Sequence, residues 1–535
     1  MKKMILSALM AILGIAGATT AQIAVFPQPE YIDMSQGEYV VTDKTKIVVE
    51  DGMGTPAARF AEDMSQWFDS ARKMKIARSG KGIKLREDKC IAEEGYELTV
   101  TPDGVVVIGG SEAGVYYGLQ TLRQMIVAGG GRVPCCYIAD EPTFAYRGAH
   151  LDVCRHFFTV DQVKRYIDIL AAHKINRFHW HLTDAQGWRI EIKKYPRLAT
   201  VGGVGSHSDP DSPCAYYTQD EIHDIVRYAA DRHIMIIPEI DMPGHATAAN
   251  RAYPEYNGGG EGIFPDFTFN PGKEETYTFL SDILAEVAGL FPGPYIHIGG
   301  DEVAYGINAW KTDPHVLALM KREGFTDVRQ CERYFMNRMI SQVSHLGKTL
   351  IGWDELLDLD VDESTGIMWW RHDKPGYLVR SLTAGYPTVL CPRKPLYFDF
   401  VQHDGHTVGR VWDGFCPLGD VYAFPDPWFD SIGVTPRQQS HILGLQANAW
   451  SELLHNSRRV DFMTWPRLCA VAESAWTQAA NKNFESFESR LDDAYRLFDK
   501  LGIYYFDHRD PAHHAEPAGP VIKKKSRESE TDYRD

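Results

Sequence analysis

Eight short apolar segments, each about the length of one β-strand, follow one another between residues 144 and 505. They are GAHLDV, INRFHWHL, IMIIPEI, YIHIGG, TLIGWD, GIMWW, YPTVLC and HILGLQAN. Amphipathic helical patterns separate several of them, for example at 161–173, 220–232 and 274–289. Strands that alternate with helices over this length predict a (β/α)₈ barrel. A doubly wound open sheet is the alternative, but no strand leads into a glycine-rich phosphate loop, so the sequence does not favour nucleotide binding.

Residues 22–143 show a different pattern, with β-rich runs such as TKIVVE and GVVVIGG and helical patterns at 55–71 and 112–126. Asp103-Gly104 stands between YELTVT and VVVIGG, which predicts a β-hairpin. We therefore expect an α/β protein in which a small α/β domain precedes a catalytic barrel at 144–505.

Both ends of the chain depart from these folded patterns. Lys2 and Lys3 precede an apolar stretch from residue 4 to 16 and small residues up to Ala21, which predicts a signal peptide over 1–21. The apolar stretch is shorter than the roughly 20 residues that span a bilayer, so we expect an exported, periplasmic or secreted protein without membrane insertion. Residues 506–535 are polar and charge-dense, which predicts a disordered tail.

Charge and cysteine content exclude several classes of partner. Lys and Arg total 56 against 72 Asp and Glu, a net charge of −16, so no general basic field is available for nucleic acid. The nine cysteines are widely dispersed and form no CxxC pair, so neither a disulfide scaffold nor a structural zinc site is expected. Neither the charge nor the cysteine content predicts an oligomeric state.

The ends of the predicted strands carry the polar and aromatic residues that chemistry requires. In chain order they are Asp152 with Arg155-His156, Thr183-Asp184, Glu239 with Asp241 and His245, Asp301-Glu302, Trp353, Trp370, Tyr397 with Asp399, and Trp450 with Glu452. Active sites of (β/α)₈ barrels lie at the carboxyl ends of the strands. This shared placement predicts one active site at that face.

Asp301 and Glu302 are the most informative of these residues. They are adjacent and follow YIHIGG, whose glycines let the backbone bend and bring both carboxylates to one site. Two close carboxylates do not both ionise easily, so one stays protonated and serves as a general acid while the other stays anionic. That division of roles is what cleavage of a glycosidic bond needs.

Seven longer motifs resemble the β-N-acetylhexosaminidases of glycoside hydrolase family 20. They occur in family order between residues 146 and 452, and the resemblance as a whole covers nearly all of the chain that follows residue 21: YRGAHLDVCRHF, NRFHWHLTDAQGWRIEIKKYP, IPEIDMPGHA, HIGGDEV, IGWDE, YFD and LQANAWSE. The resemblance also covers the small domain that precedes the barrel. It implies an exo-acting enzyme whose partners are glycans with terminal N-acetylhexosamine and which needs no cofactor and no metal.

The resemblance implies a mechanism in which the substrate's own 2-acetamido carbonyl attacks the anomeric carbon. Glu302 would protonate the leaving oxygen and later deprotonate the incoming water. Asp301 would accept the acetamido N–H and stabilise the oxazolinium-like intermediate. Tyr397 would donate a hydrogen bond to the acetamido oxygen.

Further residues take roles from the same resemblance. Trp353, Trp370 and Trp450 match the walls of the acetamido pocket, and Arg147, Asp399 and Glu452 match the groups that grip the non-reducing ring. Asp184 and His245 match a pair that positions the acid. Successive strand residues face opposite ways, so Trp370 is expected to line the pocket while Trp369 packs between strand and helix. Trp412 is a looser match to a platform for the leaving sugar.

Three alternatives stay open. Arg393 and Lys394 lie just before Tyr397, and two cations there would suit a 6-sulfated N-acetylglucosamine. His179-Trp180-His181 places two imidazoles on one face of a strand, a spacing that metal-dependent amidohydrolases use. A non-catalytic glycan-binding barrel would keep the aromatic residues, although the retained Asp301-Glu302 pair disfavours it.

Overall fold

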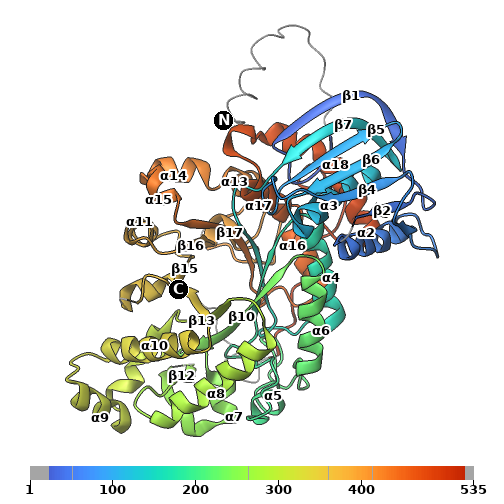
Figure 1. Cartoon of the computed structure of the whole chain (residues 1–535). Coiled ribbons are helices and arrows are strands. Elements are labelled where there is room, and N and C mark those ends of the chain that lie inside the picture. Colours follow the sequence, from blue (N-terminus) through green and yellow to red (C-terminus); the bar gives the residue numbers. More distant parts are fainter. Residues whose placement is uncertain (1–22, 51, 263, 360, 413, 524–535) are drawn as a thin grey trace.

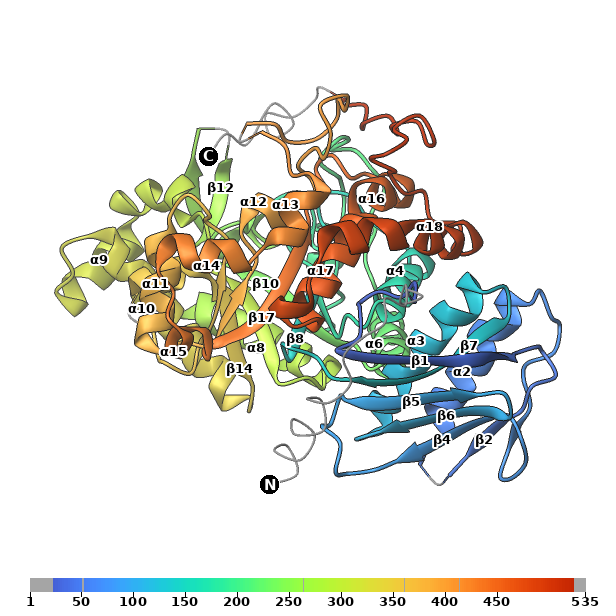
Figure 2. The same cartoon turned by 90° about the horizontal axis from the view of Figure 1, so that it is seen from above.

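The computed structural model describes residues 23–523, except residues 51, 263, 360 and 413. The predicted signal peptide at 1–21 lies outside the described residues. The chain folds into a closed parallel barrel and a smaller seven-stranded sheet beside it (Figures 1 and 2). Within the part that is described, no helix is both long enough and apolar enough to cross a membrane.

The barrel contains all eight predicted strands, each pairing in parallel with its neighbours in the order β10-β13-β14-β15-β16-β17-β8-β9. Their bounds are β8 Tyr146–Asp152, β9 Arg177–His181, β10 Met235–Met242, β13 Tyr295–Gly299, β14 Thr349–Trp353, β15 Gly366–Trp369, β16 Thr388–Leu390 and β17 Ile442–Ala449. Because the strands are parallel, their carboxyl ends meet on one face. The prediction of a (β/α)₈ barrel is therefore confirmed.

Helices cover the outside of the barrel. The longer ones are α4 Val160–Ala172, α6 Gln219–Ala230, α8 Glu274–Leu290, α10 Val328–His345, α11 Pro375–Ala384, α17 Arg467–Trp476 and α18 Phe484–Leu501. Thr159 and Thr218 start α4 and α6 with capping boxes, in which Gln162 and Glu221 return the bond to the cap backbone. Among the described residues between β14 and β15, which exclude residue 360, there is no long helix, and the connection contains the 3₁₀ segment η4 Asp354–Leu359.

The N-terminal domain is an α/β sheet with the strand order β1-β7-β5-β6-β4-β2-β3. Its elements are β1 Tyr31–Val40, β2 Ile47–Val49, α2 Gly54–Trp67, β3 Ile76–Ala77, β4 Ile83–Glu87, β5 Tyr96–Thr101, β6 Gly104–Gly109, α3 Glu112–Ala128 and β7 Arg132–Asp140. The predicted hairpin is present, with Thr101 paired to Gly104. The helix α18 at the far end of the chain lies beside this domain, next to α3 (Figure 1).

Buried polar contacts join the N-terminal domain to the lower end of the barrel, where the strands begin. Lys174 donates to Asp140 at 3.0 Å and to the Tyr96 hydroxyl at 2.9 Å, and the side chains of Lys174 and Asp140 are fully buried. The indole of Trp476 donates to the second oxygen of Asp140 at 2.8 Å. These bonds fix the two domains against each other, away from the face that carries the site.

The predicted disorder of 506–535 is wrong for the part that the structure describes. Glu516 accepts hydrogen bonds from the backbone N–H groups of Thr407 and Val408 and pairs with Arg459 at 3.1 Å. His513 and His514 lie against Tyr505 and Tyr504, respectively. Composition missed this segment because a few specific contacts, and not an apolar pattern, hold it on the barrel. Residues 524–535 lie outside the described residues.

Candidate active site

A cavity opens at the carboxyl ends of the barrel strands and brings most of the predicted site residues together. Those that line it are His245, Asp301, Glu302, Trp353, Trp370, Tyr397, Trp450 and Glu452. Asp184 and Asp399 lie directly behind this lining, where each contacts a residue that faces the cavity. Arg155, Arg393, Arg410 and Trp412 complete the wall.

The backbone around Asp301 and Glu302 is folded tightly after β13. Gly299 has φ +68°, and a Cβ there would lie 1.8 Å from the carboxylate oxygen Oδ1 of Asp241, so only glycine fits. Glu302 itself has φ +52°, and His245 has the same value, in the left-handed region that costs free energy for a non-glycine residue. Strained backbone at two facing residues is typical of a functional site.

Asp301 and Glu302 face one imidazole. His245 Nε2 lies 3.3 Å from Glu302 Oε2 and 3.5 Å from Asp301 Oδ2. Burial raises the pKa of Asp301 to about 7; the His245 charge opposes this shift, and the charge of Glu302 adds to it. Burial, and not the neighbouring carboxylate, is thus the main cause of the raised pKa of Asp301, and the predicted competition with Glu302 adds a smaller part.

Asp184 holds the other side of His245. Asp184 Oδ1 lies 3.2 Å from His245 Nδ1, and its Oδ2 lies 2.8 Å from Arg155 Nη1. Burial opposes ionisation of Asp184, but Arg155 and His245 outweigh it and hold the pKa of Asp184 well below its usual range. Burial likewise opposes the charge on His245, yet its carboxylate neighbours, Asp184 foremost, raise its pKa well above the ordinary value. The pair is thus a carboxylate and an imidazolium.

Aromatic side chains form the predicted box. Trp370 and Tyr397 lie nearly parallel, 6.4 Å apart, and Trp450 faces Tyr397 at 6.0 Å. Trp353 is fixed by a 3.0 Å bond from its indole N–H to Glu239, and Trp370 by one of the same length to Glu355. Because these bonds hold the rings in place, the box is preformed.

The far end of the cavity carries charged groups suited to sugar hydroxyls. Arg410 Nε donates to Asp399 at 2.6 Å and Arg410 Nη2 donates to Glu452 at 2.9 Å. Burial opposes ionisation of Glu452, but Arg155 and Arg410 hold its pKa at about 2. One buried oxygen each of Asp399 and Glu452 has no hydrogen-bond partner among the described residues. These two buried oxygens can therefore accept hydrogen bonds from a ligand.

The prediction that Arg147 grips the substrate is wrong. Arg147 lies at the start of β8, fully buried, and donates to both oxygens of Glu94 at 2.8 and 3.0 Å. Its guanidinium lies 4.9 Å from the Trp476 ring at the opposite end of the barrel from the site. Arg155, eight residues later in the same motif, is the arginine that lines the cavity.

The structure places the two members of each of two adjacent residue pairs, Trp369-Trp370 and Arg393-Lys394, in different surroundings. Trp369 is fully buried and lies 5.1 Å from Trp428 of α14 (Asp426–Ile432), as expected, while Trp370 faces the cavity. Arg393 lines the cavity, where it pairs with Asp373 at 2.7 Å, but Lys394 lines a different surface pocket. Arg393 and Lys394, the pair of cations on which the 6-sulfate alternative is based, therefore do not line one cavity together.

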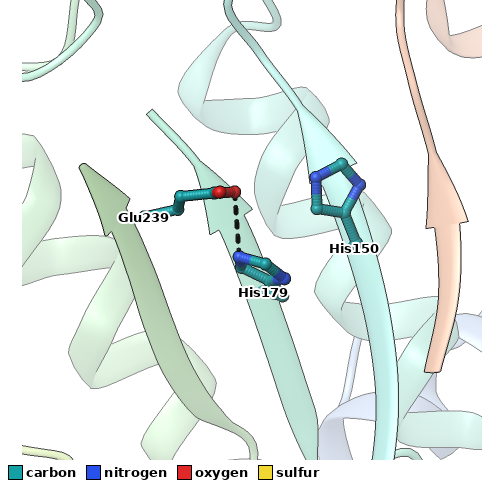
Figure 3. Close-up of side chains that lie close together, drawn as sticks. All are labelled: His150, His179 and Glu239. Carbon is teal, nitrogen blue, oxygen red and sulfur yellow. Dashed lines mark ion pairs between the residues drawn. The ribbon is translucent and has the colours of Figure 1, made fainter. Parts of the chain in front are cut away.

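The two histidines of the HWH motif, His179 and His181, point into the interior of the barrel, where both contact Glu239. His179 of β9 and His150 of β8 lie on neighbouring strands, with Glu239 of β10 opposite them (Figure 3). His179 Nε2 and His181 Nδ1 lie 3.0 and 2.5 Å from Glu239. His150, His179 and Glu239 are close enough to share a metal ion, yet all are fully buried and offer no opening for a water or substrate. This geometry disfavours the amidohydrolase alternative.

A wider groove continues from the cavity past Glu302. It has a volume of about 730 Å³ and shares Glu302, Trp370, Arg393 and Trp412 with the cavity. Its far wall comes from α10 and η4. Glu302 therefore borders both the cavity and the adjoining groove.

Sequence reasoning did not single out Arg410 as a site residue. Arg410 comes from the loop after Phe400, and it reaches the site because Phe400 and Arg410 pair as an isolated bridge. This loop has no periodic pattern, so only the length between YFD and LQANAWSE was available as a signal. Arg155 was visible at a strand end, but the resemblance assigned its role to Arg147.

Comparisons with known proteins agree with this geometry. Residues 144–479 match the model for the catalytic domain of glycosyl hydrolase family 20, and residues 22–141 match domain 2 of the same family. A β-hexosaminidase of Porphyromonas gingivalis is 39% identical over 511 residues, which are 90% of this chain and 64% of that protein. A β-N-acetylhexosaminidase of Cellulomonas fimi is 31% identical over 90% of this chain and 95% of its own length.

A solved structure extends the likeness to three dimensions. The exo-β-N-acetylglucosaminidase of Vibrio harveyi in complex with N-acetylglucosamine superposes with a TM-score of 0.84 at 31% identity, covering 92% of this chain and 80% of that one. A barrel with a carboxylate pair and an aromatic box at its carboxyl face defines a glycoside hydrolase. The chain belongs to glycosyl hydrolase family 20 and carries its catalytic domain and its domain 2.

Proposed function

We propose that the protein is an exo-acting, retaining β-N-acetylhexosaminidase that removes terminal, non-reducing β-linked N-acetylglucosamine or N-acetylgalactosamine from glycans. One observation carries the proposal: Asp301 and Glu302 line one cavity together with the aromatic box, and Glu302 also borders the adjoining groove. Glu452 and Arg410 are joined by a hydrogen bond in the wall of this cavity and would bind the hydroxyl groups of a terminal ring, so we expect action on terminal residues.

In the first step the acetamido carbonyl oxygen of the substrate attacks the anomeric carbon while the glycosidic bond breaks. Glu302 gives its proton to the leaving oxygen, and the bicyclic oxazolinium ion forms. Asp301 accepts the acetamido N–H and stabilises the positive charge, and the Tyr397 hydroxyl donates to the acetamido oxygen. Trp353, Trp370 and Trp450 exclude water and hold the acetamido group in the geometry for attack.

In the second step a water molecule attacks the anomeric carbon from the groove side. Glu302, now a carboxylate, takes a proton from this water, and the oxazolinium ring opens to regenerate the acetamido group. Two displacements at one carbon retain its configuration. The leaving group departs through the groove, past Trp412.

Asp399, Glu452 and Arg155 bind the hydroxyl groups of the terminal ring. The buried, unpartnered oxygens of Asp399 and Glu452 accept from hydroxyl groups, and Arg155 donates. Burial raises the pKa of Asp399 to about 6, although Arg410 opposes the shift, so this carboxyl is an anion above that pH. Lys394, the second cation that the 6-sulfate alternative requires, lines a different pocket.

The export signal at residues 1–21 supports a periplasmic or secreted enzyme. Lys2 and Lys3, the apolar stretch after them and the small residues up to Ala21 have the three-part pattern of a cleaved leader. Expression of the full chain followed by N-terminal sequencing of the exported product tests this; we expect a mature protein that starts near Gln22.

Release of p-nitrophenol from its β-N-acetylglucosaminide, β-N-acetylgalactosaminide and 6-sulfated N-acetylglucosaminide tests the function, with EDTA in a parallel set. We expect turnover of at least one of the two unsulfated substrates that EDTA does not reduce. Glu302→Gln should lose at least about 1000-fold in kcat on the aryl glycoside. No turnover of any substrate by correctly folded protein would contradict the proposal and favour a glycan-binding barrel, and loss of turnover in EDTA would favour a metal enzyme.

A further inference from the structure

His179 and His181 are two buried imidazoles on one strand, and the mechanism above uses neither. Both side chains are inaccessible to solvent and both reach Glu239, at 3.0 and 2.5 Å, respectively. They differ at the second nitrogen. His181 Nε2 lies 2.8 Å from Asp184 Oδ2, whereas His179 Nδ1 accepts from the amide of Gln446 at 3.0 Å.

His181 thereby joins the barrel core to the acid through an unbroken series of polar contacts. From Glu239 the series runs to His181 at 2.5 Å, to Asp184 at 2.8 Å, to His245 at 3.2 Å and to Glu302 at 3.3 Å. Every member except Glu302 is buried. A carboxylate therefore alternates with an imidazole over the whole distance.

An imidazole with a carboxylate at each nitrogen is stabilised as an imidazolium, because only the charged ring donates from both positions. Burial opposes the charge on His181, but Glu239 and Asp184 outweigh it and raise its pKa well above the ordinary value. Burial lowers the pKa of His179 to about 4 despite Glu239, so this ring stays neutral at neutral pH. The same carboxylate thus faces one charged and one neutral ring.

We propose that His181 is a positioning residue for the hydrolysis proposed above: its imidazolium anchors Asp184 and, through Asp184 and His245, fixes the orientation and proton affinity of Glu302. The inference rests on the proposed function. Without His181, Asp184 keeps Arg155 as a partner but loses its bond to the core, so its grip on His245 loosens.

The groups around His181 give the sign of the expected shift. Facing it are His150, Asp152 and Arg155 from β8 and the loop after it, His179 and Asp184 from its own strand and loop, and Glu239 and Asp241 from β10. If the positive charge of His181 is removed, the negative charges of Asp184 and Glu239 are neutralised less completely. Glu302 then holds its proton more tightly, and the pH above which the acid is deprotonated rises.

His181→Gln and His179→Gln form a matched pair, since both remove a buried imidazole from Glu239 but only the first breaks the contact with Asp184. The readout is kcat and the pH profile of kcat/KM on the p-nitrophenyl N-acetylglucosaminide, with the melting temperature of each variant. We expect His181→Gln to lower kcat by about 10- to 100-fold. Its alkaline limb should move up by about half to one pH unit, while that of His179→Gln stays in place.

Three outcomes are decisive. An alkaline limb in His181→Gln that coincides with that of His179→Gln, in an active wild type, would overturn the inference and leave the proposed function intact. A folded wild type without turnover would overturn the proposed function and this inference with it. If His181→Gln does not fold, ring-nitrogen NMR of the histidine-labelled wild type decides, because the inference requires His181 to stay doubly protonated at pH 8. A neutral ring would overturn it.

Discussion

Arg147 and Arg155 lie eight residues apart, at and just beyond the two ends of β8, and their surroundings are chemically alike. Both are buried, both pair with carboxylates and both lie over a tryptophan ring, at 4.9 Å from Trp476 for Arg147 and 5.0 Å from Trp450 for Arg155. Arg147 directs its bonds to Glu94 and to backbone carbonyls of the protein itself. Arg155 pairs with Asp184 and borders the cavity.

Position along the strand, and not residue chemistry, thus determines whether the arginine ion pair holds the two domains together or lies at the cavity. At the amino end of β8 a second domain closes over Arg147 and supplies its partner, Glu94. At the carboxyl end Arg155, Arg410 and Glu452 instead line the cavity.

The largest effect is expected for Asp301→Asn, at the carboxyl end. The amide cannot stabilise the oxazolinium charge, so kcat/KM on the aryl N-acetylglucosaminide should fall by at least about 1000-fold. In the wild type, Asp301 with a pKa of about 7 is anionic only above that pH, so kcat/KM should fall as the pH drops below about 7. A pH profile that stays level down to pH 5 would contradict this assignment.

The same substitution should stabilise the fold at high pH. The pKa of Asp301 is raised in the folded state, so its contribution to stability is present below its unfolded pKa and is lost as the pH rises through about 7. Asp301→Asn removes that loss and should raise the free energy of unfolding at pH 8 by about 1–2 kcal/mol. Equal urea stability of variant and wild type at pH 8 would show that the site does not strain the fold in this way.

Arg155→Met comes next. It removes a cation that faces the cavity, so Asp184 and Glu452 each lose a positively charged neighbour. We expect kcat/KM to fall by about 100-fold per folded molecule. The activity is to be normalised to folded protein by circular dichroism, since the loss of a buried charge also destabilises. Activity within threefold of wild type would place the ring-binding function elsewhere.

Arg147→Met is the counterpart at the amino end, and its effect should lie in stability alone. Glu94 is partly exposed, at 24% of its side chain, which softens the cost of leaving it unpaired, so we expect a loss of about 2 kcal/mol in the free energy of unfolding. kcat/KM per folded molecule should stay within twofold of wild type. If Arg147→Met lost activity but kept its full stability, Arg147 would act in catalysis as Arg155 does, and the functional difference between the two ends of β8 would be contradicted.

The smallest effect is expected for Lys394→Ala. This side chain faces a pocket apart from the cavity, so the ratio of kcat/KM for 6-sulfated and unsulfated aryl N-acetylglucosaminides should not change by more than about twofold. Arg410→Ala is the comparison, since it removes a bond to Glu452 and should reduce kcat/KM for both substrates. A loss confined to the sulfated substrate in Lys394→Ala would restore the 6-sulfate alternative.

The sequence predicted the eight barrel strands because each is a short, mainly apolar segment and helical patterns separate several of them. It also predicted Asp301, Glu302 and the three box tryptophans, which directly follow or end such strands. It could not separate Arg147 from Arg155, because the residue that decides, Glu94, belongs to the other domain. Arg410 and the contacts of Glu516 depend on loops whose positions only the tertiary fold determines.

A series of aryl N-acylglucosaminides with zero to three fluorine atoms on the acetyl methyl group tests whether the substrate's acetamido group is the nucleophile. Fluorine withdraws electrons from the carbonyl oxygen that attacks. The account predicts that kcat falls steeply along the series, by more than about 100-fold overall. A kcat that is independent of fluorination would contradict it and require a nucleophile supplied by the protein.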